Sequence, residues 1–157
     1  MNATIKNIFI LILTLSITSC GFQLRGSQDN SFSSIQIDGI SSGFTKELKK
    51  KYKQSGVEIK HSSAEKSIEI LIDQFDKRIL SLSSTGKIRE YQLNYNISYR
   101  IKSSLGSWGP VIKINSTREY SYDDNNIVAK EEEERNLVEG MKEQIIRTMR
   151  SQISSAK

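Results

Sequence analysis

EYQLNYNISYRI, at residues 90–101, is the stretch of sequence that decides the fold of this chain. Polar and apolar residues alternate there, and the apolar positions are Tyr91, Leu93, Tyr95, Ile97, Tyr99 and Ile101. Because successive side chains of a β-strand point to opposite faces of the sheet, this pattern predicts a long strand with one buried and one solvated face. One-sided strands of this kind are typical of antiparallel sheets, which bury one face against a second layer.

The segments before and after this stretch add further strands. We predict strands at residues 34–39, 68–82 and 112–122, together with a brief extended piece at residues 57–59. Ile68, Ile70 and Ile72 alternate cleanly, but the register blurs near Gln74. One inserted residue exchanges the two faces of a strand, so this slip indicates a β-bulge or a bend.

Two segments have the periodicity of amphipathic helices. Residues 41–55 contain Phe44, Leu48 and Tyr52 at intervals of four, and a glycine follows the segment. The second segment covers residues 130–154, and its apolar stripe consists of Leu137, Met141, Ile145, Met149 and Ile153. Helices with one apolar stripe need a partner layer, and the sheet has one apolar face to offer. The predicted fold class is therefore α+β: a two-layer sandwich in which two helices pack on one face of a mostly antiparallel four-stranded sheet.

The first helix segment is crowded with basic residues, namely Lys46, Lys49, Lys50, Lys51 and Lys53. They form either a basic patch for phosphate groups or a solvated helix face, and a solvated face is the commoner origin of such a run. Residues 131–134 at the start of the second helix are all glutamate. We interpret them as a solvated helix start that suits the helix dipole, not as a metal site.

Residues 1–19 have the composition of a signal peptide. Lys6 supplies a sparse positive region, residues 8–17 are almost wholly apolar, and small residues precede Cys20. The apolar run is shorter than the roughly 20 residues that cross a bilayer, so we predict a cleaved signal peptide. The alternative is a plain signal peptide, or an N-terminal anchor helix, with an incidental cysteine.

Cys20 resembles the acylated cysteine of a bacterial lipobox, which carries lipid and becomes the new N-terminus. It is the only cysteine of the chain, so it cannot form a disulfide within it. Several acyl chains, at about 0.8 kcal/mol per buried methylene, make such an anchor effectively permanent. Residues 20–157 then form a single domain. Gly21, at a position where proteins held back from the outer membrane tend to have Asp, favours the periplasmic side of the outer membrane.

The sequence contains no convincing catalytic or metal-binding constellation. His61 is the sole histidine and lies in a polar stretch, so a histidine-based metal site would have one imidazole. No serine stands in a nucleophile-elbow motif. Asp73 and Asp76 lie on a strand that is rich in polar outward positions. We therefore predict that the protein is not an enzyme, and we expect no catalytic residue, metal ion or cofactor.

The polar face of the long strand and its neighbours offers a binding surface instead. We place five cations on it: Arg78, Lys87, Arg89, Arg100 and Arg118. Guanidinium and ammonium groups form short charge-assisted bonds to phosphate, so this surface suits an anionic headgroup. A merely solvated sheet face is the open alternative. The net charge of +5 would also suit nucleic acid, but the predicted periplasmic location argues against that partner.

Several short motifs, in the same order along the chain, resemble a known family. They are CGFQLR at residues 20–25, Gly86 followed by EYQL at 90–93, and REYSYD at 118–123, which continues into VAK at 128–130. Glu133, Glu134 and Leu137 of the last helix extend the match. Together these motifs resemble the LptE (RlpB) family of lipopolysaccharide-assembly lipoproteins of the outer membrane.

The resemblance implies both a fold and a function. The fold is a sandwich with two helices on one face of a four-stranded sheet. The function is that of a lipoprotein subunit that assembles and plugs the barrel of the outer-membrane protein LptD and assists lipopolysaccharide delivery to the outer leaflet. A polar sheet face fits this expectation, because the lumen of such a barrel is filled with water.

The resemblance also implies lipopolysaccharide binding through basic residues near a hairpin tip and near the start of the last helix. Lys130 matches the second position. Ser84 stands at the first position, where the family can carry a basic residue, and Lys87 and Arg89 supply positive charge close by. A helix-start lysine without a ligand is the alternative for Lys130.

Two other functions remain as alternatives at this point. A periplasmic transport-auxiliary or lipid-binding lipoprotein without a barrel partner would need an apolar cavity between sheet and helices, whereas the apolar stripes look sized to close on each other. A cell-wall hydrolase would need a nucleophile or a metal cluster.

Overall fold

The computed structural model describes residues 31–103 and 106–156 of the chain. The elements follow in the order β1 (Ser34–Gly39), α2 (Gly43–Gln54), β2 (Glu58–Ile59), β3 (Lys66–Leu82), β4 (Ile88–Ile101), β5 (Ile112–Ser121), the 3₁₀ turn η2 (Asp124–Asn126) and α3 (Ile127–Ser155). The predicted signal peptide, Cys20 and Gly21 lie outside the described residues. Neither of the described α-helices is long and apolar enough to cross a membrane.

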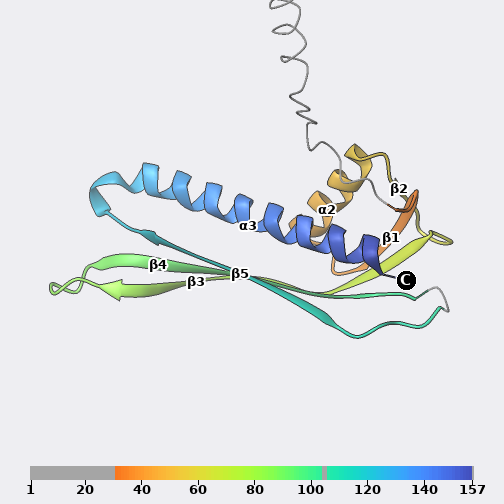
Figure 1. Cartoon of the computed structure of the whole chain (residues 1–157). Helices are drawn as coiled ribbons and strands as arrows, with labels where there is room; N and C mark the ends of the chain where they lie inside the picture. The colour runs from red at the N-terminus through yellow and green to blue at the C-terminus, as the bar shows by residue number, and fades with distance from the viewer. Residues whose placement is uncertain (1–30, 104–105, 157) are drawn as a thin grey trace, which may run out of the picture.

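The described strands form one sheet in the order β2-β1-β3-β4-β5 (Figure 1). β3, β4 and β5 form an antiparallel meander, whereas β1 runs parallel to both β2 and β3. The prediction of a mostly antiparallel four-stranded sheet is therefore wrong in detail, since the described sheet has five strands and is mixed. α2 connects β1 to β2, and a helical crossover returns the chain in the same direction, so the extended piece predicted at 57–59 pairs as a parallel edge strand.

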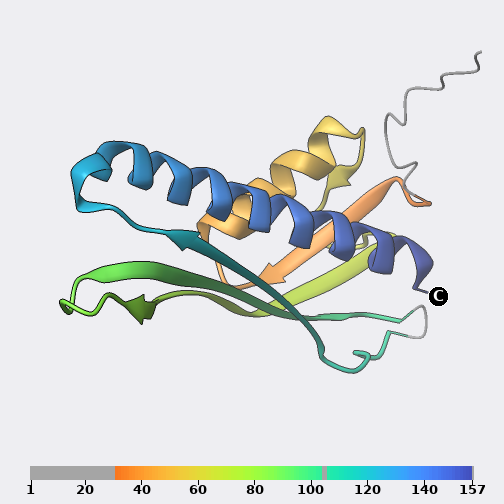
Figure 2. The ribbon, with the colours of Figure 1, turned by 60° about the vertical axis from the view of Figure 1, so that its left-hand side comes forward.

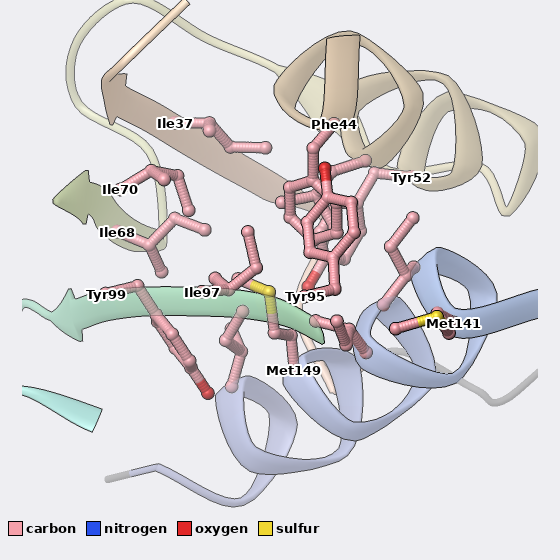
Figure 3. Close-up of a cluster of buried hydrophobic side chains, with 14 of the residues drawn as sticks. Ile37, Phe44, Tyr52, Ile68, Ile70, Tyr95, Ile97, Tyr99, Met141 and Met149 are labelled. Atoms are coloured by element: carbon pink, nitrogen blue, oxygen red, sulfur yellow. The ribbon is translucent and has the colours of Figure 1, made fainter. Parts of the chain in front are cut away.

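The centre of β4 confirms the alternation from which the fold was predicted, although Gln92 and Ser98 on the opposite face are also buried. Its residues Leu93, Tyr95, Ile97 and Tyr99 are all buried, with at most 4% of their surface exposed. α2 and α3 both lie over the face to which these side chains point (Figures 1 and 2). Figure 3 shows side chains from the sheet and from both helices meeting in one cluster, which includes Ile37, Phe44, Tyr52, Ile68, Ile70, Tyr95, Ile97, Tyr99, Met141 and Met149.

A β-bulge in β3 exchanges the two faces to which its side chains point. Leu71 is inserted in the register between β3 and β4, so that Leu71 and Ile72 together oppose Ser98. Ile70, before the bulge, is 1% exposed, whereas Ile72 points to the other face and is 42% exposed. The slip predicted near Gln74 is thus confirmed as a bulge, but the bulge lies earlier in the strand.

β1 ends beside this bulge and leaves the rest of β3 as an edge of the sheet. Gly39 has a φ of +93° and lies so close to β3 that an added Cβ would be 2.1 Å from the carbonyl oxygen of Ile70. Beyond that point the described part of β3 pairs with β4 alone. This free edge carries large exposed apolar residues, namely Ile72, Phe75, Ile79, Leu80 and Leu82.

Both helices begin with local signals. Ser42 caps α2, because its side-chain oxygen accepts a hydrogen bond from the backbone N–H of Thr45 at 3.1 Å. α2 buries the predicted residues Phe44, Leu48 and Tyr52. α3 starts at Ile127, before the predicted Lys130, because it continues directly from the turn η2.

Candidate functional site

The β3–β4 turn, the end of β5 and the start of α3 meet at one end of the molecule (Figure 1). Lys87 lies in that turn, and Lys130 lies near the start of α3. The turn is held by the side chain of Ser83, which accepts a hydrogen bond from the Lys87 N–H at 3.0 Å. The end of β5 joins it, since the Tyr122 N–H donates to the Arg89 carbonyl at 2.7 Å. The structure therefore places the predicted cations Lys87, Arg89 and Lys130 on neighbouring segments.

Two of these three cations already face carboxylates. The Lys87 ammonium lies 3.8 Å from Asp124, and both side chains are mostly exposed, so this pair contributes little to stability. The Lys130 ammonium donates to Glu133 at 2.8 Å and to the Ser121 hydroxyl at 3.2 Å, and its side chain is only 19% exposed.

Arg89 and Ser84 complete the tip of the hairpin. Both are exposed, and the Arg89 side chain has no hydrogen bond or ion pair with any described residue. Asp123 adds negative charge close to Lys130. Hydrogen bonds from Asn125 and Asn126, first of all the backbone N–H of Asn125, hold the pKa of the Asp123 carboxyl below its usual value despite the opposing effect of desolvation. A phosphate group at this end would therefore bind Arg89 directly and compete with carboxylates for the two lysines.

A second polar cluster, which the sequence analysis missed, fastens the hairpin to α3. Lys77 of β3 donates to Glu134 of α3 at 2.5 Å, and the Tyr120 hydroxyl of β5 donates to the same carboxylate at 2.5 Å. The Lys77 ammonium also lies 4.1 Å from the centre of the Tyr91 ring, a cation–π distance. Lys77 and Glu134 line a groove of about 620 Å³ between β3 and the two helices. No short sequence motif could have revealed this cluster, because its members are far apart in the chain.

The cluster gives a pH-dependent stability. Burial would raise the pKa of Glu134, but the hydrogen bonds from Lys77 and Tyr120 outweigh burial and lower it. For Lys77, burial lowers the pKa, and the hydrogen bonds with Glu134 and Tyr120 outweigh it and raise the pKa. Burial and the Glu134 carboxylate raise the pKa of Tyr120 to about 12. A carboxyl whose pKa is lower in the folded state stabilises the fold above its unfolded pKa, and this contribution is lost as the pH falls through the folded pKa.

We expect Glu134→Gln to lower the free energy of unfolding by roughly 1–2 kcal/mol at neutral pH, as is usual for hydrogen bonds to a charged group. The difference from the original protein should shrink as the pH falls below 4.5, the ordinary pKa of this carboxyl. Urea unfolding at a series of pH values measures both. Glu132→Gln is the comparison, because Glu132 is exposed and bonds only within its own helix, so its loss at neutral pH should be smaller. If the difference in unfolding free energy between the original protein and Glu134→Gln stays constant with pH, the lowered pKa of Glu134 is wrong.

The outer face of the sheet is a polar surface that no described element covers. Side-chain hydrogen bonds cross it from strand to strand: Arg78 to Gln92 at 2.8 Å, Gln92 to Glu119 at 2.7 Å, Thr117 to Asn94 at 3.0 Å and Asn115 to Asn96 at 2.5 Å. We call these residues the amide ladder.

The predicted cluster of cations on this outer face does not form. Arg118 pairs with Leu93 in the register and points to the helix side, where it donates to Gln144 of α3. Arg100 is ion-paired with Glu69, and its guanidinium stacks 4.8 Å from the Trp108 ring centre. The cations of the sheet are thus divided between its two faces and its tip.

The residues considered for chemistry have ordinary surroundings. His61 is exposed in the loop between β2 and β3. Asp73 accepts a hydrogen bond from the Tyr95 hydroxyl at 2.8 Å, and Asp76 is exposed on the outer face. Among residues 31–103 and 106–156, no three His, Cys, Asp or Glu side chains are grouped so that they could hold a metal ion.

Solved structures of bacterial lipoproteins have the same fold. Lipoprotein B from Nitrosomonas europaea is 26% identical with a TM-score of 0.71, and the match covers 86% of this chain and 91% of that one. Rare lipoprotein B from Shewanella oneidensis is 21% identical with a TM-score of 0.67, covering 78% and 94%. A minor lipoprotein from Acinetobacter baumannii is 16% identical with a TM-score of 0.62, covering 79% and 92%. No curated protein matches the sequence at a significant level.

The sequence itself identifies the family. Residues 22–153 match the family described as "LptE: Lipopolysaccharide-assembly". This match spans all the described strands, α2 and nearly all of α3, and the family is one of lipopolysaccharide assembly, not a known enzyme family. The chain therefore belongs to the LptE family of lipopolysaccharide-assembly lipoproteins.

Proposed function

We propose that the protein is a non-enzymatic subunit of the lipopolysaccharide-assembly machinery, acylated at Cys20 and held on the periplasmic side of the outer membrane. There it assembles and plugs an LptD-like β-barrel and assists delivery of lipopolysaccharide to the outer leaflet. The observation that carries this proposal is the uncovered outer face of the sheet with its amide ladder.

This face suits a water-filled lumen. Its amide, hydroxyl and charged groups bond to one another and leave further donors and acceptors for polar groups on an inner barrel wall, which are the groups that line such barrels. β4 has 14 residues, and at about 3.4 Å per residue it is roughly 48 Å long, which exceeds the roughly 25 Å apolar band of an outer-membrane barrel. The sandwich is therefore long enough to traverse a barrel lumen from end to end.

The lipid-carrier alternative receives less support from the described residues. An acyl chain needs an apolar cavity, but the apolar faces of helices and sheet close on each other in one core. The groove beside Lys77 is lined mainly by charged side chains, among them Glu131, Arg135 and Glu139.

Copurification from solubilised outer membranes tests the proposal. The tagged full-length lipoprotein should bring down a large β-barrel protein in a stoichiometric amount, and depletion of the lipoprotein should reduce the assembled barrel. Recovery of the tagged protein as a free monomer, with barrel assembly unaffected, would refute the plug and favour the lipid carrier.

Lipopolysaccharide binding should depend on the tip of the hairpin and the start of α3. We expect Lys87→Glu combined with Lys130→Glu to weaken binding to the purified lipoprotein by about tenfold or more, because each change replaces a phosphate-binding cation by a repulsive anion. Lys60→Glu combined with Lys113→Glu changes the net charge equally at sites away from the hairpin tip, one half-buried and one exposed, and should bind nearly as the original does. Equal losses in the two variants, or no loss in the first, would exclude Lys87 and Lys130 as ligands.

A further inference from the structure

We infer that the outer face of α2 docks on the anionic phospholipid surface of the membrane that holds the lipid anchor. This inference rests on the proposed acylation of Cys20. The surface consists of Lys46, Lys49, Lys50 and Lys53, which we call the α2 lysine face. It is separate from the cations at the hairpin tip and from the amide ladder.

The four lysines share one side of the helix. Their spacing of three, four and seven residues, at 3.6 residues per turn, places them within an arc of about 100°. The buried residues Phe44, Leu48 and Tyr52 lie on the opposite side and attach α2 to the sheet. Lys46, Lys50 and Lys53 are exposed and Lys49 is half-buried, so the ammonium groups extend away from the core.

These four charges are not neutralised within the described protein. No described carboxylate pairs with any of them, whereas their neighbour Lys51 is paired with Glu143 of α3 at 3.0 Å. The acidic residue of α2, Glu47, is half-buried and lines both the groove beside Lys77 and a pocket that it shares with Lys46, Lys50 and Glu139, but it forms no ion pair with these lysines. At the hairpin tip, by contrast, Lys87 and Lys130 already face carboxylates. The α2 lysine face therefore offers a net positive charge to an external partner.

The described chain begins beside α2. The Phe32 ring contacts the Tyr52 ring of α2, with the centroids 5.9 Å apart. The Ser33 carbonyl accepts a hydrogen bond at 2.9 Å from Glu58, just beyond the end of that helix. The segment from Cys20 to this point can extend to at most about 40 Å, at roughly 3.6 Å per residue. A lipid on Cys20 thus keeps the start of the described chain, and the end of α2 beside it, within about 40 Å of the bilayer.

A lipid surface fits the shape of this face better than a single phosphate does. Lys46 and Lys50 border a shallow pocket that also contains Glu47 and Glu139, which disfavours a single phosphate there, whereas the four lysines along one side of the helix can meet several headgroups at once. Each lysine that lies close to an anionic bilayer raises the ratio of docked to undocked protein about fivefold. Four lysines together make docking favourable once the lipid tether has already brought the helix to the surface.

A fluorescence experiment on the lipidated protein tests the docking. Because Cys20 is acylated, the substitution Gln54→Cys, beside the lysine face, provides a single thiol for an environment-sensitive label, and Thr117→Cys provides a control label on the outer sheet face. The protein is reconstituted in phosphatidylcholine vesicles, or in vesicles with about one third phosphatidylglycerol. Nitroxide-labelled headgroups then quench any label that lies at the surface.

We expect quenching of the label at position 54 to be several-fold greater in the anionic vesicles, and to fall in about 1 M salt, where the Debye length is near 3 Å. Changing all four lysines to glutamine should abolish this difference, whereas changing them to arginine should preserve it. All three side chains have similar helix propensity, so the helix itself is retained. The label at position 117 should respond to none of these changes.

The outcomes separate the docking from the anchor. If every variant floats with neutral vesicles, the lipid on Cys20 anchors the protein, since neutral vesicles offer the lysine face no anionic headgroup. The docking is overturned, and the anchor left intact, by either of two results for protein that floats with neutral vesicles. The label at position 54 is quenched equally in neutral and anionic vesicles, or it is quenched equally in the original protein and in the glutamine variant. Flotation with anionic vesicles alone, lost in the glutamine variant, supports the docking and overturns the anchor.

Discussion

Gly39→Ala is expected to lower the free energy of unfolding by roughly 2–4 kcal/mol, a large part of the stability of a domain this size. Two effects add. The φ of +93° is strained for any residue with a Cβ, and the new methyl carbon would be 2.1 Å from the carbonyl oxygen of Ile70. Backbone cannot move aside as a side chain can, so β1 would have to separate from β3 at its end. Urea unfolding followed by circular dichroism measures the loss.

Gly140→Ala is the matched control for that substitution. Gly140 lies in the middle of α3, and an added Cβ there meets nothing within 4 Å. Alanine should stabilise the helix by up to about 1 kcal/mol, because it restricts the unfolded chain more than glycine does. If Gly39→Ala unfolds at the same urea concentration as the original protein, the close approach of β1 to β3 is wrong.

Tyr52→Ala is expected to cost roughly 3–5 kcal/mol, as is usual when a fully buried aromatic side chain is removed. Tyr52 of α2 is 0% exposed, and its ring contacts Phe32, which lies just before β1. Its hydroxyl, however, has no hydrogen-bond partner among the described residues, and burial raises the pKa of this phenol well above its usual value. Tyr52→Phe should therefore be neutral or slightly stabilising, since a buried unpaired hydroxyl opposes folding.

Tyr99 provides the comparison, because its buried hydroxyl donates to Gln152 of α3. Tyr99→Phe should lose about 1 kcal/mol, the usual net contribution of one hydrogen bond. Thermal unfolding of the two phenylalanine variants side by side would decide the matter. A larger loss for Tyr52→Phe than for Tyr99→Phe would show that the Tyr52 hydroxyl has an acceptor after all.

The sequence predicted which faces of the helices and strands are buried better than it predicted the number and register of the strands in the sheet. Alternation in β4 and the stripe of α3 each repeat over many residues, so the hydrophobic pattern alone determined which faces are buried. β2 could not be predicted as a fifth strand, because it has two residues and its pairing with β1 depends on where α2 returns the chain. The bulge at Leu71 was visible only as a blurred register, since both faces of β3 carry apolar residues beyond it.

The candidate site was predictable in part. Lys87 and Lys130 were selected through the family resemblance, and the structure places both at one end, but their pairing with Asp124 and Glu133 depends on the fold of η2 and α3. The contact of Lys77 with Glu134 joins residues 57 positions apart, and no local pattern marks it. Arg118 was assigned to the wrong face, although it follows Ile112 and Ile114 at an even number of residues and therefore points to the same side of β5 as they do.

The end of β1 beside the bulge also determines where the native molecule opens first. Between residues 72 and 82, one row of β3 backbone N–H groups faces outward without a neighbouring strand. This part of β3 is held chiefly by its pairing with β4 and by the contact of Lys77 with α3. The half of the sheet under α2 is anchored on both sides of β3. Local unfolding of β3 between residues 72 and 82 breaks fewer contacts and therefore costs less free energy. Backbone amides in this part of the hairpin should thus exchange with deuterium well before those in the strands beneath α2.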